Sequence, residues 1–309
     1  SIGAGTILDT GATAIVNAGN NAQNWNGNFT FTGTSTLNLG AGTVTLGDNV
    51  IATVSAQTLT VGGTIGDGAA TFGLTKSGAG VLILNGANTY GGLTALTNGN
   101  LTLNGNNSGA SGGVTMAAGA TLNIGHANAL GSGTLTLDGG ILNNTSGGTL
   151  TLGGNVAQVW NGAFNFLGTN DLVMGAGAVT LGATTLVTVT AGNLTVNGVI
   201  DDGLDTFNVE KNGAGTLTLA ALNTYGGVIG LNEGTLVFAV DQALTSITNA
   251  LSLGGFAGST AAFALDLSAA SARFGGTMLV QTDNVTPNTI TIGAGKTLQI
   301  DRSFTIGYN

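Results

Sequence analysis

Short segments in which polar and apolar residues alternate recur along the whole chain. Residues 43–46 read TVTL, residues 58–61 TLTV, residues 81–84 VLIL and residues 149–152 TLTL. Alternation with a period of two over four or five residues predicts a strand with one buried face. Gly-Ala-Gly, Asn-Gly and Gly-Gly stretches separate these segments, and glycine supplies the positive φ angles that tight turns need. The pattern therefore predicts an all-β protein of many short strands.

The same sequence occurs twice in the chain. AQNWNGNFTFTG around Trp25 returns as AQVWNGAFNFLG around Trp160, and the same constant offset carries Lys76 onto Lys211 without a gap. The duplication extends from about residue 11 to about residue 236. We therefore predict a first module over residues 1–135, its second copy within residues 136–240, and diverged coils over residues 241–309.

Three all-β arrangements could use such strands. A sandwich would divide into domains of about 100 residues, whereas the duplicated unit is longer. An outer-membrane barrel needs strands of about ten residues, and these segments are too short. We predict a parallel β-helix with about 20–25 residues per coil, in which columns of Leu, Val, Ile and Phe point inward and columns of Thr and Asn point outward.

Composition removes several classes of function. The chain has 56 Gly but one Pro, no Cys and 6% charged residues, which argues against collagen, disorder, a disulfide framework and a thiolate metal site. The net charge is −9 and the five basic residues are scattered, so we expect no nucleic-acid partner. No apolar stretch reaches the roughly 18 residues of a membrane span, and no secretory signal begins at Ser1, so we expect a mature or excised segment.

Few residues are candidates for chemistry, and we expect no catalytic residue and no cofactor. The densest acidic cluster is Asp201, Asp202 and Asp205, followed by Glu210, and it is a weak candidate for Ca²⁺ because Ca²⁺ prefers six or more oxygen ligands. The default interpretation of the cluster is a solvated turn. The single histidine, His126, is interpreted as a turn residue.

The residues that recur in both modules are interpreted as structural. We expect Trp25 and Trp160 to pack between coils, although either ring could stack on a sugar. Tyr90 and Tyr225 are expected to cover the hydrophobic edge of a turn. A lysine in the turn can bind exposed carbonyl groups, and this is the role expected for Lys76 and Lys211.

Residues 74–103, LTKSGAGVLILNGANTYGGLTALTNGNLTL, resemble the autotransporter-associated β-strand repeat of bacterial passenger domains. The repeat pattern is Leu-x-Lys-x-Gly-x-Gly-x-Leu-x-Leu, then Gly-x-Asn-x-Tyr-x-Gly, then Gly-x-Leu. The second copy, residues 209–236, carries Val209 in place of the first Leu and Ala221 in place of the loop Gly. The resemblance implies a right-handed parallel β-helix that is exported and displayed on the cell surface or released from it.

From these features we expect an extracellular surface fibre or adhesive stalk that is not an enzyme. The open ends of a solenoid favour self-association into filaments, and a surface glycan or host surface is a possible ligand. One alternative is a β-helix lyase or hydrolase of acidic polysaccharides, which would use the Asp201, Asp202 and Asp205 cluster. Another is a Thr-x-Thr face that binds ice or crystalline glycans, for which the candidates are Thr43/Thr45, Thr58/Thr60, Thr134/Thr136 and Thr149/Thr151.

Overall fold

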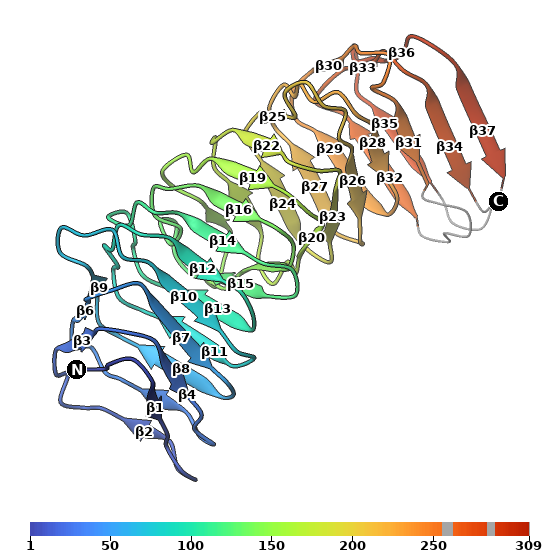
Figure 1. The fold of residues 1–309 in the computed structure, drawn as a ribbon. Coiled ribbons are helices and arrows are strands. Elements are labelled where there is room, and N and C mark those ends of the chain that lie inside the picture. Colours follow the sequence, from blue (N-terminus) through green and yellow to red (C-terminus); the bar gives the residue numbers. More distant parts are fainter. Residues whose placement is uncertain (255–261, 283–287, 309) are drawn as a thin grey trace. The chain divides into compact units, whose positions relative to one another are not determined.

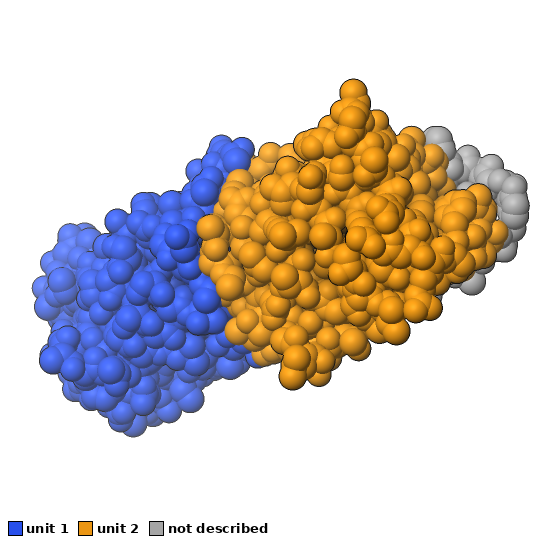
Figure 2. All heavy atoms as spheres, turned by 90° about the horizontal axis from the view of Figure 1, so that it is seen from above, with its two compact units in different colours: residues 1–157 blue, residues 158–309 orange. Residues whose placement is uncertain are grey.

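The computed structural model describes residues 1–254, 262–282 and 288–308, and within them every regular element is a β-strand (Figure 1). The chain divides into two compact units, residues 1–157 and residues 158–309 (Figure 2). The described residues contain no helix that could cross a membrane. The predicted all-β class is confirmed.

Unit 1 contains three stacks of hydrogen-bonded strands. The first stack is β1 (Thr6–Leu8), β4 (Phe29–Phe31), β7 (Val50–Val54), β10 (Leu74–Ser77), β12 (Thr94–Leu96), β14 (Val114–Met116) and β16 (Leu135–Leu137). The second is β2 (Ile15–Val16), β5 (Leu37–Asn38), β8 (Thr58–Val61), β11 (Val81–Leu84), β13 (Asn100–Leu103), β15 (Thr121–Ile124) and β17 (Ile141–Asn144). The third is β3 (Gln23–Trp25), β6 (Val44–Leu46) and β9 (Ile65–Gly66), and β18 (Leu150–Thr151) ends the unit.

Unit 2 contains four such stacks. The first stack is β19 (Gln158–Trp160), β22 (Val179–Leu181) and β25 (Ile200–Asp201), and the second is β20 (Phe164–Phe166), β23 (Thr185–Val189), β26 (Val209–Asn212), β28 (Ile229–Leu231), β31 (Leu251–Leu253), β34 (Met278–Thr282) and β37 (Phe304–Tyr308). The third stack is β21 (Leu172–Met174), β24 (Asn193–Val196), β27 (Thr216–Leu219), β29 (Gly234–Phe238), β32 (Phe263–Leu267) and β35 (Thr289–Ile292). The fourth is β30 (Gln242–Leu244), β33 (Ala272–Phe274) and β36 (Leu298–Ile300).

Neighbouring strands pair in parallel and belong to successive coils, as a β-helix requires. Val81 pairs with Asn100 in the next coil of unit 1, and Phe164 pairs with Val187 in the next coil of unit 2. The coils after residue 241 are longer, since Gln242 finds its partner only at Ala272. The parallel solenoid and its predicted period are therefore confirmed for the duplicated region, and the diverged region uses longer coils.

The core of each unit is built from stacked columns of identical or similar apolar side chains. In unit 1 one continuous column consists of Leu59, Leu82, Leu101, Leu122 and Leu142, each fully buried. The residues that alternate with these leucines along each strand face outward. Two of them are hydrogen-bonded across neighbouring coils, since the side-chain amide of Asn123 donates to the hydroxyl of Thr102 at 3.2 Å. The alternation in the sequence is thus the alternation between core and surface.

The structure repeats with the sequence. β7 recurs as β23 and β10 as β26, with strand bounds that differ by the same offset as the two tryptophans. The boundary between the compact units, at residues 157 and 158, is set by contacts. The module boundaries at residues 135/136 and 240/241 rest on sequence repetition and stay a prediction.

Candidate functional site

The buried lysines close the turn that follows β10 and β26. Lys76 is 1% exposed, and its Nζ donates to the carbonyl oxygens of Ser77, Gly78 and Asn98 at 2.7–3.1 Å. Gly78 has a φ of 77°, a left-handed conformation in which the backbone carbonyl is available to an ammonium group. The lysine therefore binds turn carbonyls, as its position in the repeat predicts.

The second copy reproduces this arrangement. Lys211 is also 1% exposed and donates to the carbonyl oxygens of Asn212, Gly213 and Glu233 at 2.5–2.9 Å. Burial lowers the pKa of Lys76 and that of Lys211 to about 8, and the nearby Glu233 partly opposes this effect at Lys211. Neither lysine is available to a ligand from solvent.

The acidic cluster of unit 2 does not form one site. Asp202 is 5% exposed, and its carboxylate accepts hydrogen bonds from the backbone N–H groups of Phe207 (2.9 Å) and Gly226 (3.0 Å). Asp201 instead accepts from the N–H of Gly203 at 2.7 Å and from the hydroxyl of Thr224. These two hydrogen bonds hold the pKa of Asp201 below its usual value, and the bond from Thr224 has the larger effect.

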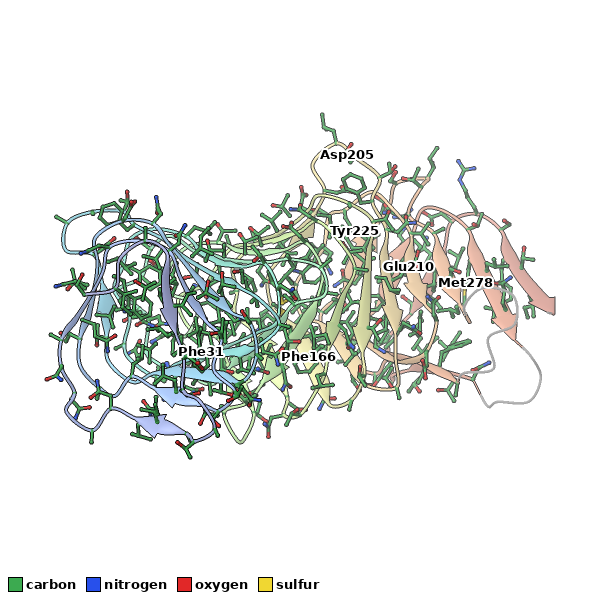
Figure 3. All side chains as sticks on the ribbon, turned by 60° about the horizontal axis from the view of Figure 1, so that its bottom comes forward. Phe31, Phe166, Asp205, Glu210, Tyr225 and Met278 are labelled. Carbon is green, nitrogen blue, oxygen red and sulfur yellow. The ribbon has the colours of Figure 1, made fainter. Side chains whose placement is uncertain are left out.

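Asp205 lies on the exposed part of the same loop (Figure 3). Across the described residues, no group of three or more His, Asp or Glu side chains is placed to hold a metal ion. The solvated-turn interpretation was wrong for Asp202, which is a buried structural carboxylate. Asp67 in unit 1 makes the equivalent bonds to the N–H groups of Phe72 (3.0 Å) and Gly91 (2.8 Å). The retention of this one aspartate in both copies was the signal that separates it from its neighbours.

The asparagine of the repeat is also structural. Asn88 is buried, and its side-chain oxygen accepts from the N–H of Ile65 at 2.9 Å. Asn223 accepts from the N–H of Ile200 at the same distance. Each asparagine thus satisfies a backbone donor of the preceding coil and fixes the corner between two coils.

Both tryptophans are completely buried. The ring of Trp25 meets that of Phe29 edge-on, with centroids 4.9 Å apart, and its indole N–H donates to the side-chain oxygen of Gln23 at 3.2 Å. Trp160 does the same with Phe164 at 5.0 Å and with Gln158 at 3.2 Å. Both rings are thus packed in the core against residues of their own coil, packing between coils stays a prediction, and neither ring is exposed to stack on a sugar.

The two tyrosines are equally buried but differ in their partners. The hydroxyl of Tyr90 lies 2.6 Å from that of Thr94. The position equivalent to Thr94 is Ile229, and the hydroxyl of Tyr225 has no hydrogen-bond partner among the described residues. Burial raises the pKa of Tyr90 to about 12, and burial together with the charge of Asp202 raises that of Tyr225 further. The second copy has therefore lost one hydrogen bond of the first.

This difference predicts opposite effects of the same substitution. Tyr90→Phe leaves the buried hydroxyl of Thr94 without its partner and should lower the free energy of unfolding by about 1–2 kcal/mol. Tyr225→Phe removes a hydroxyl that has no partner and should leave stability unchanged or raise it. Urea unfolding followed by circular dichroism measures both. Equal losses for the two variants would contradict the assignment.

The remaining candidates are separated in space. His126 lies in the bend that follows β15, and its Nδ1 accepts from the N–H of Asn128 at 3.0 Å. The Thr-x-Thr pairs lie on or directly beside β6, β8, β16 and β18, which belong to four different sheets. The pairs therefore do not line one sheet in adjacent coils, and the alternative of a Thr-x-Thr binding face is contradicted for these candidates. Whether two Thr-x-Thr pairs lie in the same sheet depends on the register of the coils, which sequence alone does not give.

Comparisons with known proteins agree with the repeat. The family model of the passenger-associated-transport-repeat matches residues 74–101 and residues 209–238, the two windows that contain the buried lysine, asparagine and tyrosine. No curated protein and no solved structure matches the chain. The chain is an all-β solenoid protein whose sequence matches the passenger-associated-transport-repeat in two windows.

Proposed function

We propose that the chain is a stalk segment of a secreted or surface-displayed passenger and that it joins other solenoid coils at its open ends. The observation that carries this proposal is the stacking of coils through continuous apolar columns, such as the one from Leu59 to Leu142. Every coil offers the same kind of parallel edge to the next, so coils can be added without a change of design.

The first coil of unit 1 and the last coil of unit 2 support the second part of the proposal. On β2, Ile15 is in register with the buried Leu37 of the next coil and is 43% exposed. On β37, Phe304 and Ile306 are 57% and 58% exposed. Edge strands with unpaired backbone groups and apolar side chains are favourable surfaces for a further parallel strand. The surface of another solenoid coil has the matching chemistry.

Self-association should therefore depend on the edge strand β37. The chain is expected to form larger species as its concentration rises in analytical ultracentrifugation, and Ile306→Lys should shift it to the monomer because a buried unpaired charge is costly. Ile51→Lys is the matched control, since Ile51 is exposed on β7, which has a paired strand on each side. A chain that stays monomeric at every concentration would overturn end-to-end stacking.

A further inference from the structure

A groove with a volume of about 420 Å³ lies on the outer surface of unit 2, over the strands β26, β28, β31 and β34. The parallel register places Glu210 beside Gly230, Gly230 beside Ser252, and Ser252 beside Leu279. These outward positions form one row across the four strands. Gly230 has no side chain, and the row is therefore hollow at that point.

Two further rows border the first. Besides Glu210, the polar lining residues are Asn208, Asn232, Ser252, Thr277 and Gln281, and the apolar ones are Val228, Ala250, Leu251 and Leu279. The volume falls within the range of about 300–1,000 Å³ that is usual for ligand pockets. The groove thus combines amide and hydroxyl groups with a small apolar surface and one carboxylate.

This face differs between the two copies at the outward positions that have an equivalent. On the inward side of the same strands Lys76 and Leu96 are retained as Lys211 and Leu231, whereas Val209 replaces Leu74 and Ile229 replaces Thr94. At the outward positions of the groove the first copy has Gly73, Thr75, Ala95 and Thr97, and the second copy has Asn208, Glu210, Gly230 and Asn232 in the same order. The second copy has gained two amides and a carboxylate and has lost the methyl group that would occupy the hollow.

The carboxylate of Glu210 is available to a ligand. Its side chain lies next to Gly230, since a β-carbon at Gly230 would lie 3.1 Å from Cγ of Glu210. Within the part of the chain that the structure describes, the side chain of Glu210 makes no hydrogen bond and no ion pair. Lys211, its neighbour in sequence, faces the core. A half-buried acid beside amide groups, with no cation among the lining residues, favours a cationic ligand.

We propose that the groove binds an extended segment of another protein through one lysine or arginine, whose cation contacts Glu210. The aliphatic stem of the cationic side chain would lie on Val228 and Leu279, as long basic side chains do on apolar surfaces. The side-chain oxygen of Asn208 already accepts from the N–H of Val228 at 2.8 Å, so its NH2 group alone would donate to the peptide backbone. The side chains of Asn232 and Gln281 would also bind the peptide backbone. This site is separate from the solenoid ends on which the stalk function depends.

Two other occupants fit less well. A second copy of this chain offers one exposed basic side chain outside an ion pair, Arg302, among the described residues. Lys76 and Lys211 are buried, and Arg273 and Lys296 are paired with Asp301 (2.9 Å) and Asp241 (3.5 Å). An acidic polysaccharide would be repelled by Glu210. No aromatic ring lines the groove, so a sugar would have no ring on which to stack.

The test uses the intact chain and a short fluorescent peptide with one central lysine, followed by fluorescence polarisation. We expect saturable binding that weakens as salt is added, and a loss of binding when the lysine is acetylated. Glu210→Gln should weaken binding about tenfold, the usual effect of losing a charge-assisted hydrogen bond. Gly230→Ala should weaken it as well, since the methyl group fills the hollow and displaces Glu210.

The first copy provides the matched control. Ala95→Gly alters the equivalent position of unit 1 and should leave the affinity unchanged, and circular dichroism verifies that each variant is folded. Absence of saturable binding would overturn the proposal, as would equal affinity for the wild type, Glu210→Gln and Gly230→Ala. Binding of an amino-sugar oligomer in the absence of peptide binding would also overturn it, because the occupant would then be a glycan.

Discussion

Replacing Trp160 by alanine is expected to lower the free energy of unfolding of the surrounding coils by about 3–5 kcal/mol. The indole is completely buried, so its removal leaves a large cavity, ends the edge-on contact with Phe164 and leaves the side-chain oxygen of Gln158 without its donor. Trp25→Ala should have the same effect because its contacts with Phe29 and Gln23 are the same.

The two variants also report on one another. The chain has two tryptophans, and each compact unit contains one. In Trp160→Ala the remaining fluorescence comes from Trp25, so fluorescence and circular dichroism together show whether destabilisation stays within one unit, as expected when coils interact with their neighbours. Trp160→Phe keeps an aromatic ring and is the milder control. A loss below about 1 kcal/mol for the alanine variant would contradict the packing assigned to the indole.

Replacing Lys211 by methionine should lower the free energy of unfolding by about 3 kcal/mol. Methionine has a similar length and no charge, but it cannot donate to the carbonyl groups of Asn212, Gly213 and Glu233 that the ammonium now binds. Lys76→Met should behave alike, because Lys76 makes the equivalent three bonds. Lys296→Met is the control, since Lys296 lies on the surface in a long ion pair with Asp241, 3.5 Å apart.

The pH dependence of stability tests the same lysines without a substitution. Burial lowers their pKa to about 8 in the folded chain, whereas a lysine in an unfolded chain has a pKa of about 10.4. Between these two values the unfolded chain keeps protons that the folded chain has released, so the free energy of unfolding should rise with pH. Below about pH 8 both states are protonated and these lysines contribute no slope. Urea unfolding between pH 7 and 10 measures this, and an unchanged slope in the double methionine variant would contradict it.

The solenoid was predictable because the residues that form it repeat locally. Leu82 and Leu101 each occupy the same place in a strand that glycine-rich turns enclose, and the pattern predicts burial at both positions. The length of the later coils was not predictable, because no repeated motif marks the start of each coil after residue 241. The sheet to which each Thr-x-Thr pair belongs was hidden for a related reason, since it depends on the length of every preceding turn.

The candidate sites also include features that could be predicted from the sequence and features that could not. The roles of the buried lysines and the burial of the tryptophans follow from their recurrence at one offset, and the structure agrees. The burial of Asp202 and the missing partner of Tyr225 appear only when the copies are compared position by position, here with Asp67 and Thr94. The groove beside Glu210 requires the register of four strands, and these strands are separated in sequence by the turns of the intervening coils.

The pairing of each strand with the next coil also bears on how the chain acquires its structure. Val81 pairs with Asn100 and Gln242 pairs with Ala272, so these strands pair with a strand of the next coil and not with a distant part of the chain. Each finished coil can therefore serve as the template for the next, so the chain can fold coil by coil in the order of its sequence. Every added coil buries new apolar surface, and folding gains free energy stepwise along the chain.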